Sequence, residues 1–146
     1  MKRVYNIIVL NIVAVMMTAC HFAAPEPEGE LKANYTGTVE VDNDSEHFVK
    51  EGVEVSVTKE ENSDTYTIKM FRVKFATAMP VELDILIQGV SINEDGIISG
   101  DEIIPYAMGG PYEKYKITGL TGTMTSDRLQ FEMVCGKYPT QYSGTR

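Results

Sequence analysis

Apolar side chains recur at every second position over most of this chain, which is the spacing of β-strands and not of helices. Three rows show the pattern best: Val53-Val55-Val57, Tyr66-Ile68-Met70 and Val81-Leu83-Ile85-Ile87. Neighbouring side chains of a strand point to opposite faces, so each such strand has one apolar and one polar face. Polar, turn-forming segments separate the rows. Connections this short exclude βαβ crossovers, and the pattern predicts an all-β fold of about eight antiparallel strands.

The alternation changes phase at two places. The apolar row that ends at Met70 continues at Phe71, Val73 and Phe75, and a second change falls near Gly119. One extra residue in a strand shifts the phase in this way and bends the strand. We therefore expect a β-bulge near Met70–Phe71.

Two similar strings stand at the two ends of the alternating region. Tyr35-Thr36-Gly37-Thr38 opens it, and Tyr142-Ser143-Gly144-Thr145 closes it. A glycine in mid-strand eases tight curvature or close approach of another backbone. This favours an up-and-down barrel in which the first and last strands pair and lose their exposed edges. A β-sandwich with glycines in its strands remains an alternative.

The N-terminus has the pattern of an export signal. Lys2 and Arg3 precede an apolar run that ends at Cys20, and this run is short for a membrane-spanning helix. Met17-Thr18-Ala19-Cys20 resembles a bacterial lipobox, whose cysteine is the thioether attachment point of a diacylglycerol. We expect a signal peptide over residues 1–19, a lipidated Cys20 with a flexible Pro- and Glu-rich tether over 20–33, and one domain over 34–146. A plain signal peptide or an uncleaved anchor helix is the alternative.

The charge and the scarcity of metal-binding residues exclude several function classes. Acidic residues number 21 against 13 basic ones, which argues against a nucleic-acid partner. Two cysteines and two histidines leave little material for a zinc site, and we expect no cofactor and no metal. Residues 91–102 partly match a calcium-binding loop, but position 1 is Ser91 and the flanks are not helical, so a hairpin turn is the favoured interpretation. We expect His47, which lies in an acidic loop, to be an ordinary surface residue, and we expect Cys135 to be buried. No motif indicates an enzyme.

The inward face of a small barrel either fills with side chains or leaves space for one ligand. If space is left, large apolar side chains would line it, and the candidates are Tyr35, Tyr66, Met70, Phe71, Phe131 and Met133. A core filled by these side chains is the alternative.

The chain resembles the calycin-like β-barrel domain of small Bacteroidetes lipoproteins. Beyond the opening and closing strings, the resemblance lies in Val53-Glu54-Val55-Ser56-Val57, Asp64-Thr65-Tyr66-Thr67-Ile68, Gly89-Val90-Ser91-Ile92 and Ile117-Thr118-Gly119-Leu120-Thr121-Gly122. Residues 103–114 depart from the pattern and leave the strand count there open. The resemblance implies a lipocalin-like barrel without catalytic residues, held by acylated Cys20 in the lipid bilayer of an outer membrane, on its periplasmic side or at the cell surface.

The sequence as a whole therefore predicts a membrane-anchored, non-enzymatic barrel that binds a small apolar or amphipathic molecule. The alternative is a cell-surface accessory module that binds protein or glycan through its loops.

Overall fold

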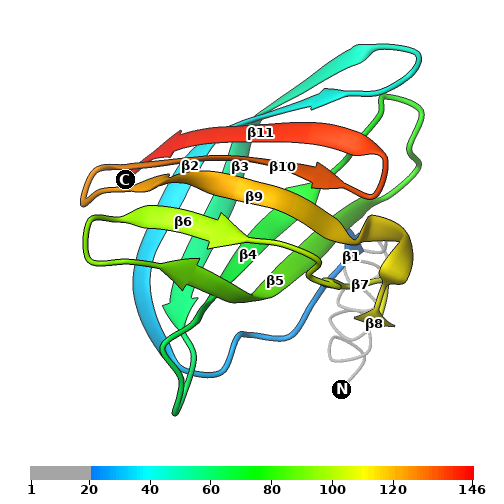
Figure 1. Cartoon of the computed structure of the whole chain (residues 1–146). Coiled ribbons are helices and arrows are strands. Elements are labelled where there is room, and N and C mark those ends of the chain that lie inside the picture. Colours follow the sequence, from blue (N-terminus) through cyan, green and yellow to red (C-terminus); the bar gives the residue numbers. More distant parts are fainter. Residues whose placement is uncertain (1–20) are drawn as a thin grey trace, which may run out of the picture.

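The alternating segments form strands throughout residues 21–146, which the computed structural model describes (Figure 1). The long strands are β2 (Glu30–Asp42), β3 (His47–Lys59), β4 (Tyr66–Val73), β5 (Glu82–Ile92), β9 (Ile117–Met124), β10 (Arg128–Cys135) and β11 (Tyr138–Thr145). The short elements are β1 (His21–Phe22), β6 (Ile97–Gly100), β7 (Tyr106–Ala107), β8 (Gly110–Pro111) and the 3₁₀ turn η2 (Glu113–Tyr115). The all-β prediction is confirmed for these residues.

Eight of these strands form a closed antiparallel ring. Its order is β2, β11, β10, β9, β6, β5, β4 and β3, and β3 returns to β2. Chain neighbours are also ring neighbours, so the barrel is the predicted up-and-down meander. The seam joins β2 to β11, where Gly37 lies directly opposite Gly144. The predicted pairing of the two end strands is confirmed, and the barrel is the correct one of the two architectures.

Bulges bend the strands where the apolar row changes phase. In β4 the register to β5 shifts between Met70 and Val73, and Arg72 adopts a left-handed backbone with φ of 53°. In β9 the left-handed Gly119 lies where the register to β10 shifts. The predicted bulge after Met70 is confirmed, and both bulges add the curvature that closure requires.

The inward side chains pack into one continuous core. Its largest fully buried members include Tyr35, Tyr142, Met70, Leu83 and Ile85. Burial of each large apolar side chain contributes about 1.5–3 kcal/mol. The Tyr142 hydroxyl, which is buried with its ring, donates a hydrogen bond of 3.2 Å to the Val53 carbonyl oxygen.

Residues 103–114, whose strand count the sequence left open, form the small β7–β8 hairpin and the start of η2 at one end of the barrel. Aromatic rings gather at this end. Phe75 lies 5.0 Å from Tyr115 and 5.6 Å from Tyr138, centroid to centroid, and Tyr112 lies 4.8 Å from Tyr115. Such pairs pack more favourably than area alone predicts, so they help to close this end.

The segment before the barrel lies on the outer face of β4 and β5. Strand β1 runs parallel to the start of β5, with His21 opposite Glu82. Strand β2 begins at Glu30, four residues before the expected domain boundary at 34. Of the expected tether, residues 21–29 make specific contacts with the barrel, which are described below. Residues 1–20, with the predicted signal peptide and Cys20, lie outside the described residues.

Candidate functional site

Of the six residues predicted to line the interior, four lie together in it. Tyr35, Met70, Phe131 and Met133 belong to the core and are at most 3% exposed. The Tyr35 hydroxyl reaches past the core and donates to the Thr125 carbonyl oxygen at 2.7 Å.

The other two predicted residues are placed differently. Tyr66 is half-buried and packs against the edge of the core. Phe71 does not join the core, because the β4 bulge begins at Met70 and leaves Phe71 on the same strand face as Lys69. The Lys69 ammonium nitrogen lies 4.5 Å from the centre of the Phe71 ring.

Side chains of β3, β4, β5 and β10 fill the barrel interior. Val55, Ile68, Ile85, Ile87 and Leu129 have an exposed fraction of 0%. A cavity that held even one water molecule would leave accessible surface on the side chains around it. The filled core is therefore the interpretation that these residues support, and space for a ligand has to be sought elsewhere.

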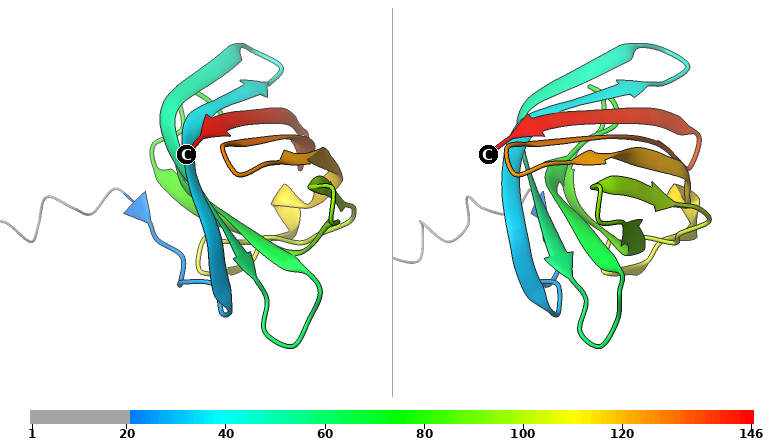
Figure 2. Two further views of the ribbon diagram at one scale, coloured as in Figure 1. Left: turned by 90° about the vertical axis from the view of Figure 1, so that its left-hand side faces the viewer. Right: turned by 60° about the vertical axis from the view of Figure 1, so that its left-hand side comes forward.

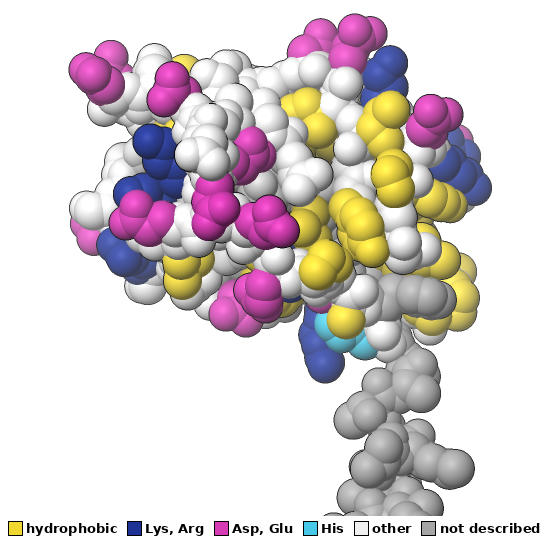
Figure 3. Space-filling view, turned by 90° about the horizontal axis from the view of Figure 1, so that it is seen from below, with side chains coloured by type: hydrophobic (Ala, Val, Ile, Leu, Met, Phe, Trp, Pro, Cys, Tyr) yellow, Lys and Arg dark blue, Asp and Glu magenta, His cyan; other side chains and the backbone are white. Residues whose placement is uncertain are grey.

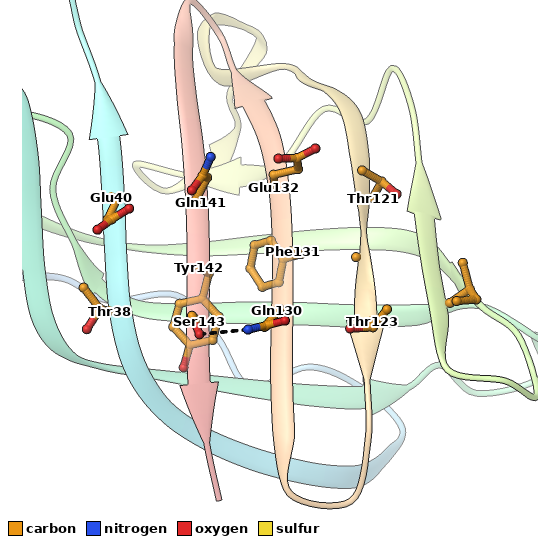
Figure 4. Close-up of a pocket in the computed structure, with 12 residues that line it drawn as sticks. Thr38, Glu40, Thr121, Thr123, Gln130, Phe131, Glu132, Gln141, Tyr142 and Ser143 are labelled. Carbon is orange, nitrogen blue, oxygen red and sulfur yellow. Dashed lines mark hydrogen bonds between the residues drawn. The ribbon is translucent and has the colours of Figure 1, made fainter.

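A shallow groove of about 580 Å³ crosses the outer face of the sheet (Figure 4). Two rows of outward side chains flank it, each running across neighbouring strands. The first row comprises Glu40, Gln141, Glu132 and Thr121, and the second comprises Thr38, Ser143, Gln130, Thr123 and Ile97. The register aligns Tyr142, Phe131 and Gly122 between the two rows. The rings of Tyr142 and Phe131 turn into the core, so the backbone forms the floor of the groove.

The geometry of the sheet sets the size of this groove. The second row crosses five strands from β2 to β6, which is about 19 Å at the usual strand spacing. The rows are two residues apart, or about 7 Å. At Gly122 a Cβ atom would lie 2.1 Å from the Gln130 carbonyl oxygen, so only glycine fits the floor there.

The chemistry of the groove is that of uncharged hydrogen-bonding groups. Hydroxyl and amide side chains make up four of the five members of the second row and two of the four members of the first row, and these groups both donate and accept. The Gln130 amide and the Ser143 hydroxyl lie 3.4 Å apart, which links β10 to β11 along the second row. Glu40 and Glu132 add negative charge at one side, which disfavours an anionic ligand. Exposed Ile97 adds an apolar contact at one end.

A second polar cluster lies across the ring from this groove, on the outer face of β4 and β5. Its members are Lys69 and Asp84, whose side chains are 2% and 3% exposed although both point away from the core. Residues 21–29 cover both side chains. Among the other titratable residues, His47 forms a 2.5 Å pair with Asp42 at the surface, and this hydrogen bond raises the pKa of His47.

The remaining sequence candidates have structural roles. The Asn93 side-chain oxygen accepts hydrogen bonds from the backbone N–H groups of Asp95 and Ile97, so the predicted hairpin turn between β5 and β6 is confirmed. Cys135 is fully buried, its thiol donates to the Tyr115 carbonyl oxygen at 3.6 Å, and burial raises its pKa to about 12. A thiol with this pKa is a poor nucleophile at neutral pH.

Residues 21–146 contain no group of three or more His, Cys, Asp or Glu side chains placed to hold a metal ion. No helix within the same range is long and apolar enough to cross a bilayer.

Comparisons with protein-family models, with curated proteins and with solved structures find no match. The resemblance to calycin-like lipoproteins therefore stays a prediction from the sequence.

Proposed function

We propose that this protein is a membrane-anchored, non-enzymatic binding barrel that uses the groove across β2, β11, β10, β9 and β6 as its binding surface. The observation that carries this proposal is the contrast between a filled interior and an outer face with two aligned rows of polar side chains, of which the second is almost entirely hydroxyl and amide groups. The register between strands fixes these rows, so a ligand meets side chains that are already aligned.

The ligand that fits this surface best is a neutral oligosaccharide lying across the strands. Sugar hydroxyls need partners that both donate and accept, as Thr, Ser and Gln do. The groove is about 19 Å long, which accommodates several sugar units linked end to end. Such a surface also suits the predicted alternative, an accessory module that binds glycan, but it places the contact on the sheet face and not on the loops.

The small apolar ligand predicted from the sequence finds less support. It would have to displace packed side chains such as Ile85 and Leu129, and the packing of such side chains is worth a great deal, since truncation of a buried Leu or Ile to Ala typically costs about 2–5 kcal/mol. This ligand remains the competing proposal.

For the membrane attachment, the support is the lipobox-like Met17-Thr18-Ala19-Cys20 after an apolar run. We propose a bacterial outer-membrane lipoprotein of the calycin-like type, with Cys20 acylated and the barrel on the periplasmic side or at the cell surface. Two or three acyl chains are sufficient for durable anchoring.

The test is a binding titration followed by NMR, with neutral oligosaccharides and, separately, a long-chain fatty acid. We expect the oligosaccharides to shift backbone signals of β9, β10 and β11. Gln130→Ala combined with Gln141→Ala should weaken this binding at least tenfold, because two amides are lost. The matched control is Gln88→Ala, which removes an exposed amide from β5 across the ring.

Three results would overturn parts of the proposal. Fatty-acid binding that shifts core signals would support the competing interior ligand. Equal binding by the double variant and the control would show that the groove is not the binding surface. Release of shorter sugars during the titration would show that the protein is an enzyme.

A further inference from the structure

Residues 21–29 form specific contacts with the barrel that a free tether would not make. The His21 Nε2 atom lies 2.5 Å from an Asp84 carboxylate oxygen. The backbone N–H of Ala24 donates to the other Asp84 oxygen at 3.1 Å. The N–H of Arg72, next to the β4 bulge, donates to Asp84 as well, at 3.0 Å.

Lys69 holds the next part of the same segment. Its ammonium group donates to the carbonyl oxygens of Ala24 and Pro25 at 3.1 Å and 3.3 Å, and it lies 3.5 Å from a Glu26 carboxylate oxygen. The Phe71 ring lies against the same ammonium group.

The burial of these two side chains depends on the segment that covers them. Lys69 and Asp84 lie on the outward face of β4 and β5, where water would surround them if residues 21–29 were absent. A buried charge is stable only with hydrogen-bonding partners, and here the backbone of residues 24 and 25 supplies several of them. The pair therefore acts as a clamp for a segment that Pro25 and Pro27 already hold extended.

From this geometry we infer that residues 21–29 fix the orientation of the anchored barrel, so that the face around β1 and the β7–β8 hairpin lies on the lipid bilayer and the groove points away from it. The inference rests on the proposed lipidation of Cys20. A free segment from Cys20 to Glu30 could extend about 33 Å from the membrane. With the clamp closed, the chain is held against the barrel from His21 on, which is the residue after the proposed lipidation site.

The position of this face in the ring gives the direction of the groove. In the ring order, β5 is four strands from β11, and β4 is four strands from β10, which is half of the circumference in each case. Figure 2 shows β1 on the side of the barrel away from β9 and β10. The groove is centred on β10 and β11, so a bilayer at β1 leaves it open to solution.

The surface near β1 has side chains suited to a bilayer. Ile104 and Met108 flank the short strand β7 and are 43% and 42% exposed. Strand β7 pairs with β5 at Leu86, only a few residues from the site where β1 pairs with β5. Figure 3 shows hydrophobic side chains gathered over one part of this face of the molecule. Apolar side chains at such a surface insert into the headgroup region of a bilayer.

The test uses the processed, full-length protein in vesicles of phosphatidylethanolamine and phosphatidylglycerol. Met108→Cys and Gln130→Cys each receive a fluorophore, and buried Cys135 stays unlabelled because burial raises its pKa to about 12. Nitroxide-labelled lipids should quench the label at position 108 strongly and the label at position 130 weakly. His21→Ala combined with Ala24→Pro removes two hydrogen bonds to Asp84 and should reduce the difference between the two positions. The matched control is His47→Ala, which removes the surface pair with Asp42 and none of the hydrogen bonds of the clamp.

Separate readouts distinguish the failure of this inference from the failure of the anchor. If the protein does not float with the vesicles, the proposed lipidation is wrong. If it floats but both labels are quenched equally, or if the clamp variant behaves like the control, the orientation is wrong. Hydrogen exchange tests the clamp in either case, since we expect a protected Ala24 amide, and exchange at the rate of an unfolded chain would refute it.

Discussion

The closure of the barrel can be tested by the substitution Gly37→Ala, which adds one methyl group at the seam. Gly37 lies opposite Gly144 in the seam between β2 and β11. A Cβ atom built on Gly37 would lie 2.0 Å from the Ser143 carbonyl oxygen and 2.3 Å from the Gly144 Cα. Both are backbone atoms, so no side-chain rotation can relieve the overlap. Gly37→Ala must therefore push β2 away from β11.

The expected loss of stability follows from that displacement. The two strands must separate by about an ångström at a point where ladder hydrogen bonds tolerate little change. Overpacking of this kind costs about 3 kcal/mol. For a domain of this size, that loss lowers Tm by about 10 °C.

Thermal unfolding followed by circular dichroism measures this loss, and urea unfolding provides the free energy. The matched control is Gly110→Ala in the β7–β8 hairpin, where a Cβ atom would meet nothing within 4 Å and φ is not left-handed. We expect the control to unfold with a nearly unchanged Tm. If Gly37→Ala and Gly110→Ala unfold within about 2 °C of each other, the close approach at the seam is not present.

Three further predictions concern the buried polar groups. Tyr142→Phe removes the donor to the Val53 carbonyl oxygen and should lower the free energy of unfolding by about 1–2 kcal/mol in urea titrations; an unchanged midpoint would mean that water replaces the hydroxyl. The Cys135 thiol should react with a thiol reagent only after unfolding, and fast labelling of the native protein would contradict its burial. Burial raises the pKa of Cys135 from 9.0 to about 12. Between these two pH values the thiol releases its proton in the unfolded chain but not in the folded one. The contribution of the thiol to the free energy of unfolding is therefore complete below pH 9 and is lost as the pH rises toward 12. Urea unfolding between pH 8 and 11 should show a loss of about 1.4 kcal/mol per pH unit above pH 9 that Cys135→Ala removes, and equal slopes for the two proteins would refute this assignment.

Much of the fold could be predicted because strand periodicity is a local property of the sequence. The alternating rows correspond to β3, β4 and β5, and the phase change after Met70 corresponds to a bulge. The matching strings around Gly37 and Gly144 indicated the seam, since a closed meander pairs its first and last strands. The position of Phe71 was harder to predict, because the phase changes over several residues and Phe71 remains on the outer face.

The groove could not be predicted, because it depends on register between strands and not on any one strand. Thr38, Ser143 and Gln130 each look like ordinary solvent-facing positions, and only the pairing of β2, β11 and β10 aligns them. The one available signal was the frequency of uncharged Thr, Ser and Gln at outward positions, where Lys and Glu are more usual.

The clamp was missed for a different reason. Residues 20–33 have the Pro- and Glu-rich composition of a tether, and composition does not reveal hydrogen bonds to Asp84 and Lys69. Both of those side chains alternate with core residues and so read as solvated. Their burial becomes visible only when the segment that covers them is placed.

The proposed function depends most directly on the covalent state of the mature N-terminus. Intact-mass and peptide mass spectrometry of the protein purified from its native membrane measures this state. We predict a chain that begins at Cys20 and carries a thioether-linked diacylglycerol and an amide-linked acyl group. A mature chain that begins elsewhere, or a Cys20 with an unmodified thiol, would contradict the account of a lipid-anchored barrel.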